Sequence, residues 1–122
     1  MTPARPVSVA VLGDGGWGTT LAIHLFRCGH RVRWWGHFPD YVQVMDRCRE
    51  NGKFLPGVPI PRALPITADL RAAVEGAETI VLAVPSKFFR AVARQLKRRP
   101  RRLVRLMPSR RLWSNPRWPS RR

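Results

Sequence analysis

The sequence predicts an α/β fold in which helices flank a mostly parallel sheet of about four strands. Three observations predict it: short runs rich in β-branched residues, segments between them with apolar residues at helical spacing, and a glycine-rich turn after the first run. Apolar runs of this kind are typical of strands buried on both faces of a parallel sheet. Strands that alternate with helices favour a series of right-handed βαβ connections.

The first half of the chain contains two strand and two helix patterns. Val7–Leu12 is apolar, β-branched and followed by glycines, so it predicts a buried strand. Trp17–Arg27 has apolar residues at helical spacing, and Gly29 supplies the helix stop. Arg31–Trp35 predicts a second strand and Asp40–Glu50 a second helix.

The second half repeats the alternation. Residues 52–65 are rich in proline and glycine and predict an ordered loop. A short strand is expected at residues 66–67, then a helix over 69–75 with Asp69 near its cap. Thr79–Val84 predicts another buried strand, and residues 87–96 predict the last helix before the composition changes.

The turn after the first strand contains the most informative motif. Gly13, Gly15 and Gly18 fit the pattern G-x-G-x-x-G between a strand and a helix, which is typical of a Rossmann-like dinucleotide-binding domain. Gly13 would permit the tight turn, Gly15 a close approach of the pyrophosphate, and Gly18 close packing of helix and strand. The N-terminus of the following helix attracts phosphates. The alternative is a glycine-rich turn without a ligand.

The end of the second strand bears on the choice of cofactor. An Asp or Glu there would bind the ribose 2′-hydroxyl and repel a 2′-phosphate. The chain has no acidic residue there until Asp40, which is more readily explained as a helix cap, and Arg31 and Arg33 lie nearby. These residues predict NAD(P)H as the cofactor, with NADPH either tolerated or preferred to NADH.

Five stretches together resemble one enzyme family, the bacterial NAD(P)-dependent glycerol-3-phosphate dehydrogenases. They are GDGGWGTTLA at 13–22, GHRVRWWGH at 29–37, NGKFLPGVPIP at 51–61, TADL at 67–70 and TIVLAVPS at 79–86. The resemblance implies that residues 1–97 are an NAD(P)-binding Rossmann-like domain, incomplete relative to the family. It also implies an oxidoreductase that interconverts dihydroxyacetone phosphate and sn-glycerol 3-phosphate for phospholipid synthesis. The two cysteines, Cys28 and Cys48, form neither a zinc set nor a disulfide framework, so the cytoplasm is the expected location.

The resemblance adds four candidate cofactor-binding residues to the three motif glycines. Gly16 and Trp17 correspond to positions that bind cofactor in the family, and His37 follows the second strand at another. Phe88 resembles an aromatic residue near the nicotinamide in related enzymes. The alternatives are a core position for Trp17, a solvated loop position for His37 and helix packing for Phe88. No residue is assigned to catalysis or to a metal.

The C-terminal residues depart from the family. After the V-P-S segment the family has a T-K-G segment whose lysine contacts cofactor and substrate, and then a helical domain with a catalytic lysine. Neither is recognisable here, and no lysine follows Lys97. Since arginine stays protonated, it does not replace a lysine that cycles a proton. The chain alone is therefore expected to bind a dinucleotide and to reduce dihydroxyacetone phosphate negligibly.

The last residues are strongly basic. Residues 97–122 hold 11 of the 23 Lys and Arg and none of the seven acids of a chain with net charge +16. We define 98–122 as a basic Arg/Pro-rich tail, for which frameshift or gene truncation, nucleic-acid binding, and a solvated disordered segment are three interpretations. Leu103, Val104 and Leu106 are apolar, which favours one more edge strand over Arg102–Leu106. No apolar run is long enough for a membrane span, and no signal peptide is expected.

Overall fold

A parallel sheet forms the centre of the computed structural model, which describes residues 5–96 and 102–105. Within those residues the sheet has five strands, in the spatial order β5 (Ile66–Thr67), β2 (Arg31–Trp35), β1 (Ser8–Leu12), β6 (Thr79–Leu82) and β7 (Arg102–Arg105). All four strand pairs are parallel. The sequence predicted about four strands, and the additional one is the edge strand expected within 102–106. The chain crosses from one side of β1 to the other between β5 and β6.

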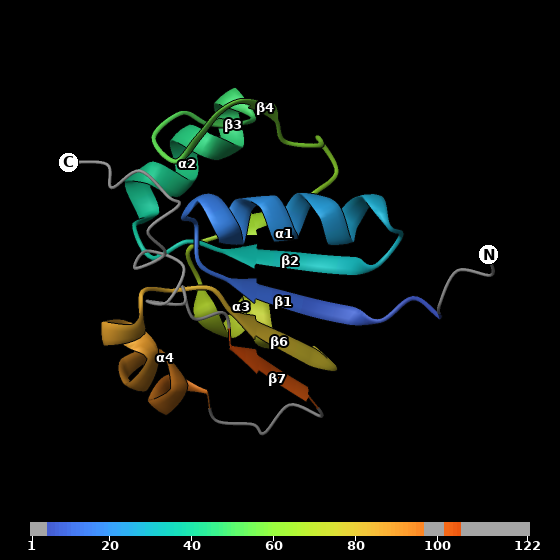
Figure 1. The fold of residues 1–122 in the computed structure, drawn as a ribbon, viewed down its shortest axis with the longest axis vertical. Coiled ribbons are helices and arrows are strands. Elements are labelled where there is room, and N and C mark those ends of the chain that lie inside the picture. Colours follow the sequence, from blue (N-terminus) through green and yellow to red (C-terminus); the bar gives the residue numbers. More distant parts are fainter. Residues whose placement is uncertain (1–4, 97–101, 106–122) are drawn as a thin grey trace, which may run out of the picture.

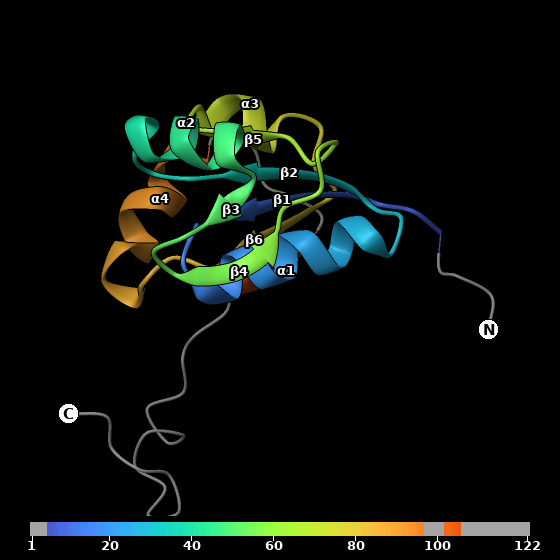
Figure 2. The same ribbon diagram turned by 90° about the horizontal axis from the view of Figure 1, so that it is seen from above.

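Helices cover both faces of this sheet. Figures 1 and 2 show α1 and α3 on opposite sides of the strands. The helices are α1 (Gly16–Arg27), α2 (Pro39–Cys48), α3 (Leu70–Val74) and α4 (Phe89–Gln95), with a single 3-10 turn, η1 (Ser86–Phe88), before α4. Asp69 caps α3 as predicted, because its carboxyl group accepts hydrogen bonds from the backbone N–H groups of Arg71 and Ala72. The explanation of Asp40 as a helix cap was wrong, because the N-cap of α2 is Phe38 and Asp40 lies in the first turn of that helix.

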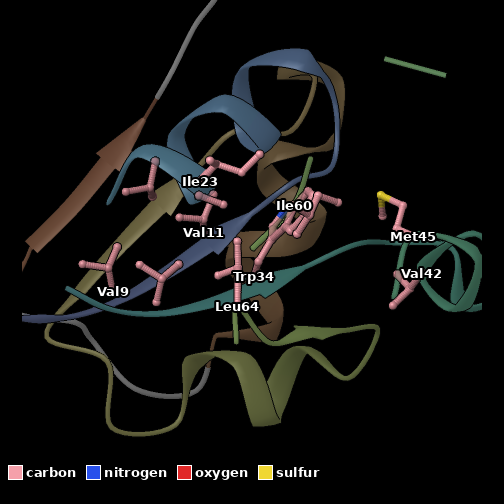
Figure 3. Close-up of a cluster of buried hydrophobic side chains, with 11 residues drawn as sticks. Val9, Val11, Ile23, Trp34, Val42, Met45, Ile60 and Leu64 are labelled. Carbon is pink, nitrogen blue, oxygen red and sulfur yellow. The ribbon is translucent and has the colours of Figure 1, made fainter. Parts of the chain in front are cut away.

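The core lies on both sides of β1, which explains why its sequence is apolar without alternation. Val9 and Val11 belong to one buried cluster, and Ala10 and Leu12 belong to another on the opposite face. Trp34 is fully buried in the first cluster, among side chains from α1, α2 and the loop before β5 (Figure 3). Its indole N–H donates to the carbonyl of Gly13 over 2.7 Å, so the core is tied directly to the glycine turn.

The segment predicted as a loop contains a second, smaller sheet. β3 (Glu50–Asn51) pairs antiparallel with β4 (Leu55–Pro59) in an irregular register. Two prolines in β4 are tolerated because each of these strands has a free edge. The prediction of an ordered loop over residues 52–65 was therefore wrong for β4, and the hairpin covers the N-terminal part of α1 (Figure 2).

The C-terminal tail is described only at β7. Interpretations of the rest of 98–122 fall outside the described residues and stay predictions. Within residues 5–96 and 102–105, no helix has both the length and the apolar character needed to cross a membrane.

Candidate functional site

The glycine turn between β1 and α1 is built by steric constraints on Gly13 and Gly18. Gly13 has a φ of +133°, and a Cβ placed on it would lie 2.4 Å from the carbonyl oxygen of Ala83 on the neighbouring chain segment. A Cβ on Gly18 would lie 2.2 Å from the carbonyl oxygen of Gly13. Both contacts are to backbone, so neither position accepts a side chain without moving the turn. These are the tight turn and the close packing that the motif predicts.

Gly15 is different, because it faces open space. It is the N-cap of α1 with a φ of −71°, and nothing lies within 4 Å of a Cβ placed on it. No acidic residue lies in the first turn of α1, and the first N–H groups of any helix lack partners inside the helix. The turn therefore presents unpaired donors and the positive end of the helix dipole to a space that an anion can enter.

The candidate residues outside the glycine motif lie at the same edge of the sheet. Trp17 follows β1, His37 follows β2 and Phe88 follows β6, so all three lie just beyond the carboxyl ends of adjacent strands. In open α/β sheets this edge is where ligands bind, at the point where the strand order reverses. That point lies next to β1 here.

The exposure of these side chains excludes a core position for Trp17. Trp17 is 72% exposed and Phe88 is 48% exposed, so neither is a core residue. Phe88 belongs to neither buried cluster, and both packing on its helix and a contact with the nicotinamide stay predictions for it. His37 is also exposed, with the rings of Trp35 and Phe38 against its edges at centroid distances of 5.7 and 4.9 Å. All three side chains are accessible to a ligand.

An open pocket of about 420 Å³ lies beside His37. Its lining comes from the ends of β2 and β5, the start of α3 and the end of α4, and consists of Trp35, His37, Ala68, Asp69, Leu70, Arg71 and Gln95. The pocket adjoins the carboxyl end of the second strand. In open α/β sheets that bind dinucleotides, the adenosine half binds at this position.

A buried asparagine holds the hairpin against the glycine turn. Asn51 is completely buried, and its amide group donates to the carbonyl of Asp14 over 2.7 Å and to the hydroxyl of Thr19 over 2.8 Å. Its side-chain oxygen accepts hydrogen bonds from the Tyr41 hydroxyl and from the backbone N–H of Phe54. We did not identify Asn51 from the sequence, where the only signal is its place at the start of the NGKFLPG stretch.

Asp14 brings a carboxyl group into the turn. Its Oδ2 is buried and has no hydrogen-bond partner among the described residues. Burial raises the pKa of this carboxyl above its usual value, against the smaller lowering effects of a backbone hydrogen bond and of the nearby His37 and Lys53. A buried carboxylate oxygen without a hydrogen-bond donor is uncommon in folded proteins and in some of them marks a functional position.

The two arginines that entered the cofactor prediction lie on β2. The guanidinium of Arg33 donates to the carbonyls of Ala72 and Glu75 over 3.0 and 2.9 Å, at the end of α3. Arg31 begins β2, at the end of the strand opposite the glycine turn. In this structure neither arginine lies at the carboxyl edge of the sheet.

Comparisons with known proteins agree with this geometry. The model of the family described as NAD-dependent glycerol-3-phosphate dehydrogenase N-terminus matches residues 8–109. The glycerol-3-phosphate dehydrogenase [NAD(P)+] of Hydrogenovibrio crunogenus is 41% identical over 92 residues, covering 75% of this chain and 27% of the relative. That of Prosthecochloris aestuarii is 50% identical over 82 residues, covering 67% of this chain and 25% of the relative.

A solved structure has the same architecture. The glycerol-3-phosphate dehydrogenase of Coxiella burnetii superposes with a TM-score of 0.74 and 35% identity, over 84% of this chain and 32% of that one. The chain spans about a quarter of the length of the two curated relatives named above.

Proposed function

The chain belongs to the family of the NAD-dependent glycerol-3-phosphate dehydrogenase N-terminus, and on that premise we propose that its glycine turn binds the pyrophosphate of an NAD(P)(H) dinucleotide. The observation that carries the proposal is the open space at Gly15, beside the N-terminus of α1. Gly13 and Gly18 keep the turn in shape, so the backbone N–H groups of the turn can donate to phosphate oxygens.

The remaining site residues divide between the two halves of the dinucleotide. His37 follows β2 and faces the adenosine half, whereas Phe88 follows β6, on the other side of β1, and faces the nicotinamide half. Gly16 and Trp17 lie in the first turn of α1 beside the pyrophosphate. The nicotinamide supplies the hydride chemistry when it is bound. The residues of this chain bind and orient the cofactor, and we assign none of them to proton transfer.

We extend the proposal to the whole protein of which such a domain is part. Its reaction would be the NAD(P)H-linked interconversion of dihydroxyacetone phosphate and sn-glycerol 3-phosphate, in the cytoplasm, for phospholipid synthesis. A positioned proton donor contributes about 10²–10⁴-fold to such a step. Because no lysine follows Lys97 and no T-K-G segment is present, we expect the 122 residues alone to lack measurable turnover.

Calorimetric titration of the 122-residue chain with NADH tests the proposal. A chain of net charge +16 attracts any polyanion, so the titration is made in about 0.5 M salt, where the Debye length is about 4 Å. Saturable binding of one dinucleotide per chain is expected, without NADH oxidation when dihydroxyacetone phosphate is added. Absence of saturable binding would refute the cofactor site, and steady oxidation of NADH would refute the expected lack of turnover.

A second candidate function depends on the charge of the tail. Eleven Lys and Arg with two tryptophans in residues 97–122 are the composition of a segment that grips phosphates and stacks bases. In that case the protein would be a cofactor-binding protein that also binds nucleic acid. A steep fall of RNA affinity with salt would support it if RNA affinity drops and the salt dependence becomes shallower when residues 106–122, which hold five of these arginines and both tryptophans, are deleted. Unchanged affinity after the deletion would refute it.

A further inference from the structure

The place where a ribose-binding acid is expected holds a glycine. In dinucleotide-binding domains an Asp or Glu after the second strand accepts a hydrogen bond from the ribose 2′-hydroxyl. Here Gly36 follows β2 directly, and the next acid along the chain is Asp40 in α2, which is exposed. By sequence alone the acceptor is missing.

The carboxyl group of Asp14 occupies the space that a side chain at residue 36 would take. A Cβ placed on Gly36 would lie 3.0 Å from Oδ2 and 3.4 Å from Cγ of Asp14, and 2.6 Å from a methyl group of Val42. The two backbones are held in this arrangement, because the N–H of Gly13 donates to the carbonyl of Trp35 over 2.9 Å. The acid thus reaches the end of β2 from the neighbouring β1 turn.

This carboxyl group has an unused capacity to accept hydrogen bonds. Oδ2 has no partner among the described residues, and a buried carboxylate oxygen is stabilised by a donor. Rotation about the Cβ–Cγ bond exchanges the two carboxyl oxygens, and the adjoining Gly15 faces open space. A ribose diol that reached this carboxyl group would offer it O–H donors. A 2′-phosphate offers acceptors and negative charge, which a neighbouring carboxylate repels.

We propose that Asp14 is the residue that selects the cofactor, accepting a hydrogen bond from the adenosine ribose 2′-hydroxyl and disfavouring a 2′-phosphate, so that the domain prefers NAD(H) over NADP(H). This inference rests on the proposed dinucleotide site and reverses the order expected from the missing acid at the end of β2. The position of Arg33 agrees with it, because its guanidinium is engaged by the carbonyls at the end of α3.

The test compares two Asp→Asn variants of the full chain. Asp14→Asn removes the carboxylate at the turn, and Asp40→Asn removes the same charge from an exposed position a few residues beyond Gly36. NADH and NADPH are titrated into each protein in about 0.5 M salt, in which exposed charges are largely screened. Asp14→Asn should weaken NADH binding about tenfold and reduce the preference for NADH, while Asp40→Asn should leave the preference unchanged. The proposal would be overturned if the ratio of the NADH and NADPH dissociation constants were the same in the wild type and in both variants.

A second measurement uses the wild-type chain alone, so its result does not depend on whether a variant folds. The wild-type chain is titrated with ADP-ribose, with its 2′-deoxy analogue and with its 2′-phosphate. The proposal expects ADP-ribose to bind about tenfold more tightly than either of the other two. A 2′-phosphate that binds as tightly as ADP-ribose would overturn the role of Asp14 while leaving the dinucleotide site in place. Failure of all three to bind would overturn the proposed function itself, and the role of Asp14 with it.

Discussion

Gly15→Ala separates the binding role of the glycine turn from its structural role. Gly15 has a φ of −71° and a ψ of −178°, a conformation that alanine also adopts, and nothing lies within 4 Å of the added methyl group. The substitution therefore changes the surface that faces the ligand and leaves the packing of the turn intact.

Two small opposing terms determine the effect on stability. Replacing a glycine by alanine lowers the conformational entropy of the unfolded chain and stabilises by about 0.4–1 kcal/mol. Gly15 is also the N-cap of α1, where alanine is disfavoured by a comparable amount, about 1 kcal/mol. The free energy of unfolding should therefore stay within about 1 kcal/mol of the wild-type value.

Dinucleotide affinity should respond much more strongly. The methyl group would stand where the pyrophosphate approaches the backbone and would hold it away from the N–H groups. A hydrogen bond to a charged group is worth about 1.5–3 kcal/mol, so the loss of one such bond weakens binding about 10- to 150-fold.

Calorimetric titration with NADH and urea unfolding measure the two effects on the same protein. Gly52→Ala is the matched control, because Gly52 also has room for a Cβ, with only a carboxylate oxygen of Glu50 as near as 4.0 Å. It should keep wild-type affinity. A Gly15→Ala protein that binds NADH as tightly as the wild type would refute the assignment of Gly15 to the pyrophosphate. One that unfolds would refute the open geometry of the turn.

Three further predictions concern the supports of the site. Asn51→Ala should lower the free energy of unfolding by about 1–3 kcal/mol in urea, because it removes the shorter of two hydrogen bonds to the carbonyl of Asp14, the other coming from the Thr19 hydroxyl over 3.4 Å. An unchanged urea midpoint would contradict this network. Trp34→Phe should cost a similar 1–3 kcal/mol, because it removes the donor to the carbonyl of Gly13, and equal stability would contradict that role. The pKa of Asp14 is raised in the folded chain above its value of 3.8 in the unfolded chain. The carboxyl group therefore contributes to the free energy of unfolding below pH 3.8, and this contribution is lost as the pH rises through the pKa of the folded chain. Asp14→Asn should flatten that decline in pH-dependent unfolding, and an unaltered slope would count against the burial of the carboxyl group.

The sequence predicted the features of this fold that depend on local pattern. Val7–Leu12 and Thr79–Val84 are largely apolar runs because β1 and β6 are buried on both faces. Gly13 and Gly15 lie between β1 and α1, and Gly18 lies in the first turn of α1. Asp69 was predictable as a cap because capping depends on residues two or three positions away.

The remaining features depend on contacts between distant segments. Asn51 meets the carbonyl of Asp14 across 37 residues, and no local pattern marks such a pair. β4 was missed because it is rich in proline and glycine and its partner, β3, has two residues. The proximity of Asp14 to Gly36 likewise follows from the parallel pairing of β1 with β2. The proposed role of Asp14 therefore depends on a contact between two strands that no local pattern in the sequence shows.

Amide chemical shifts of the isotope-labelled 122-residue chain, recorded during titration with ADP-ribose in about 0.5 M salt, test the central claim most directly. The largest changes should fall on the backbone N–H groups of Gly15, Gly16, Trp17 and Gly18, which the structure places around the start of α1. Smaller changes should follow at His37, after β2. Changes confined to the basic residues 97–122, or no saturable change at the glycine turn, would contradict a dinucleotide site there.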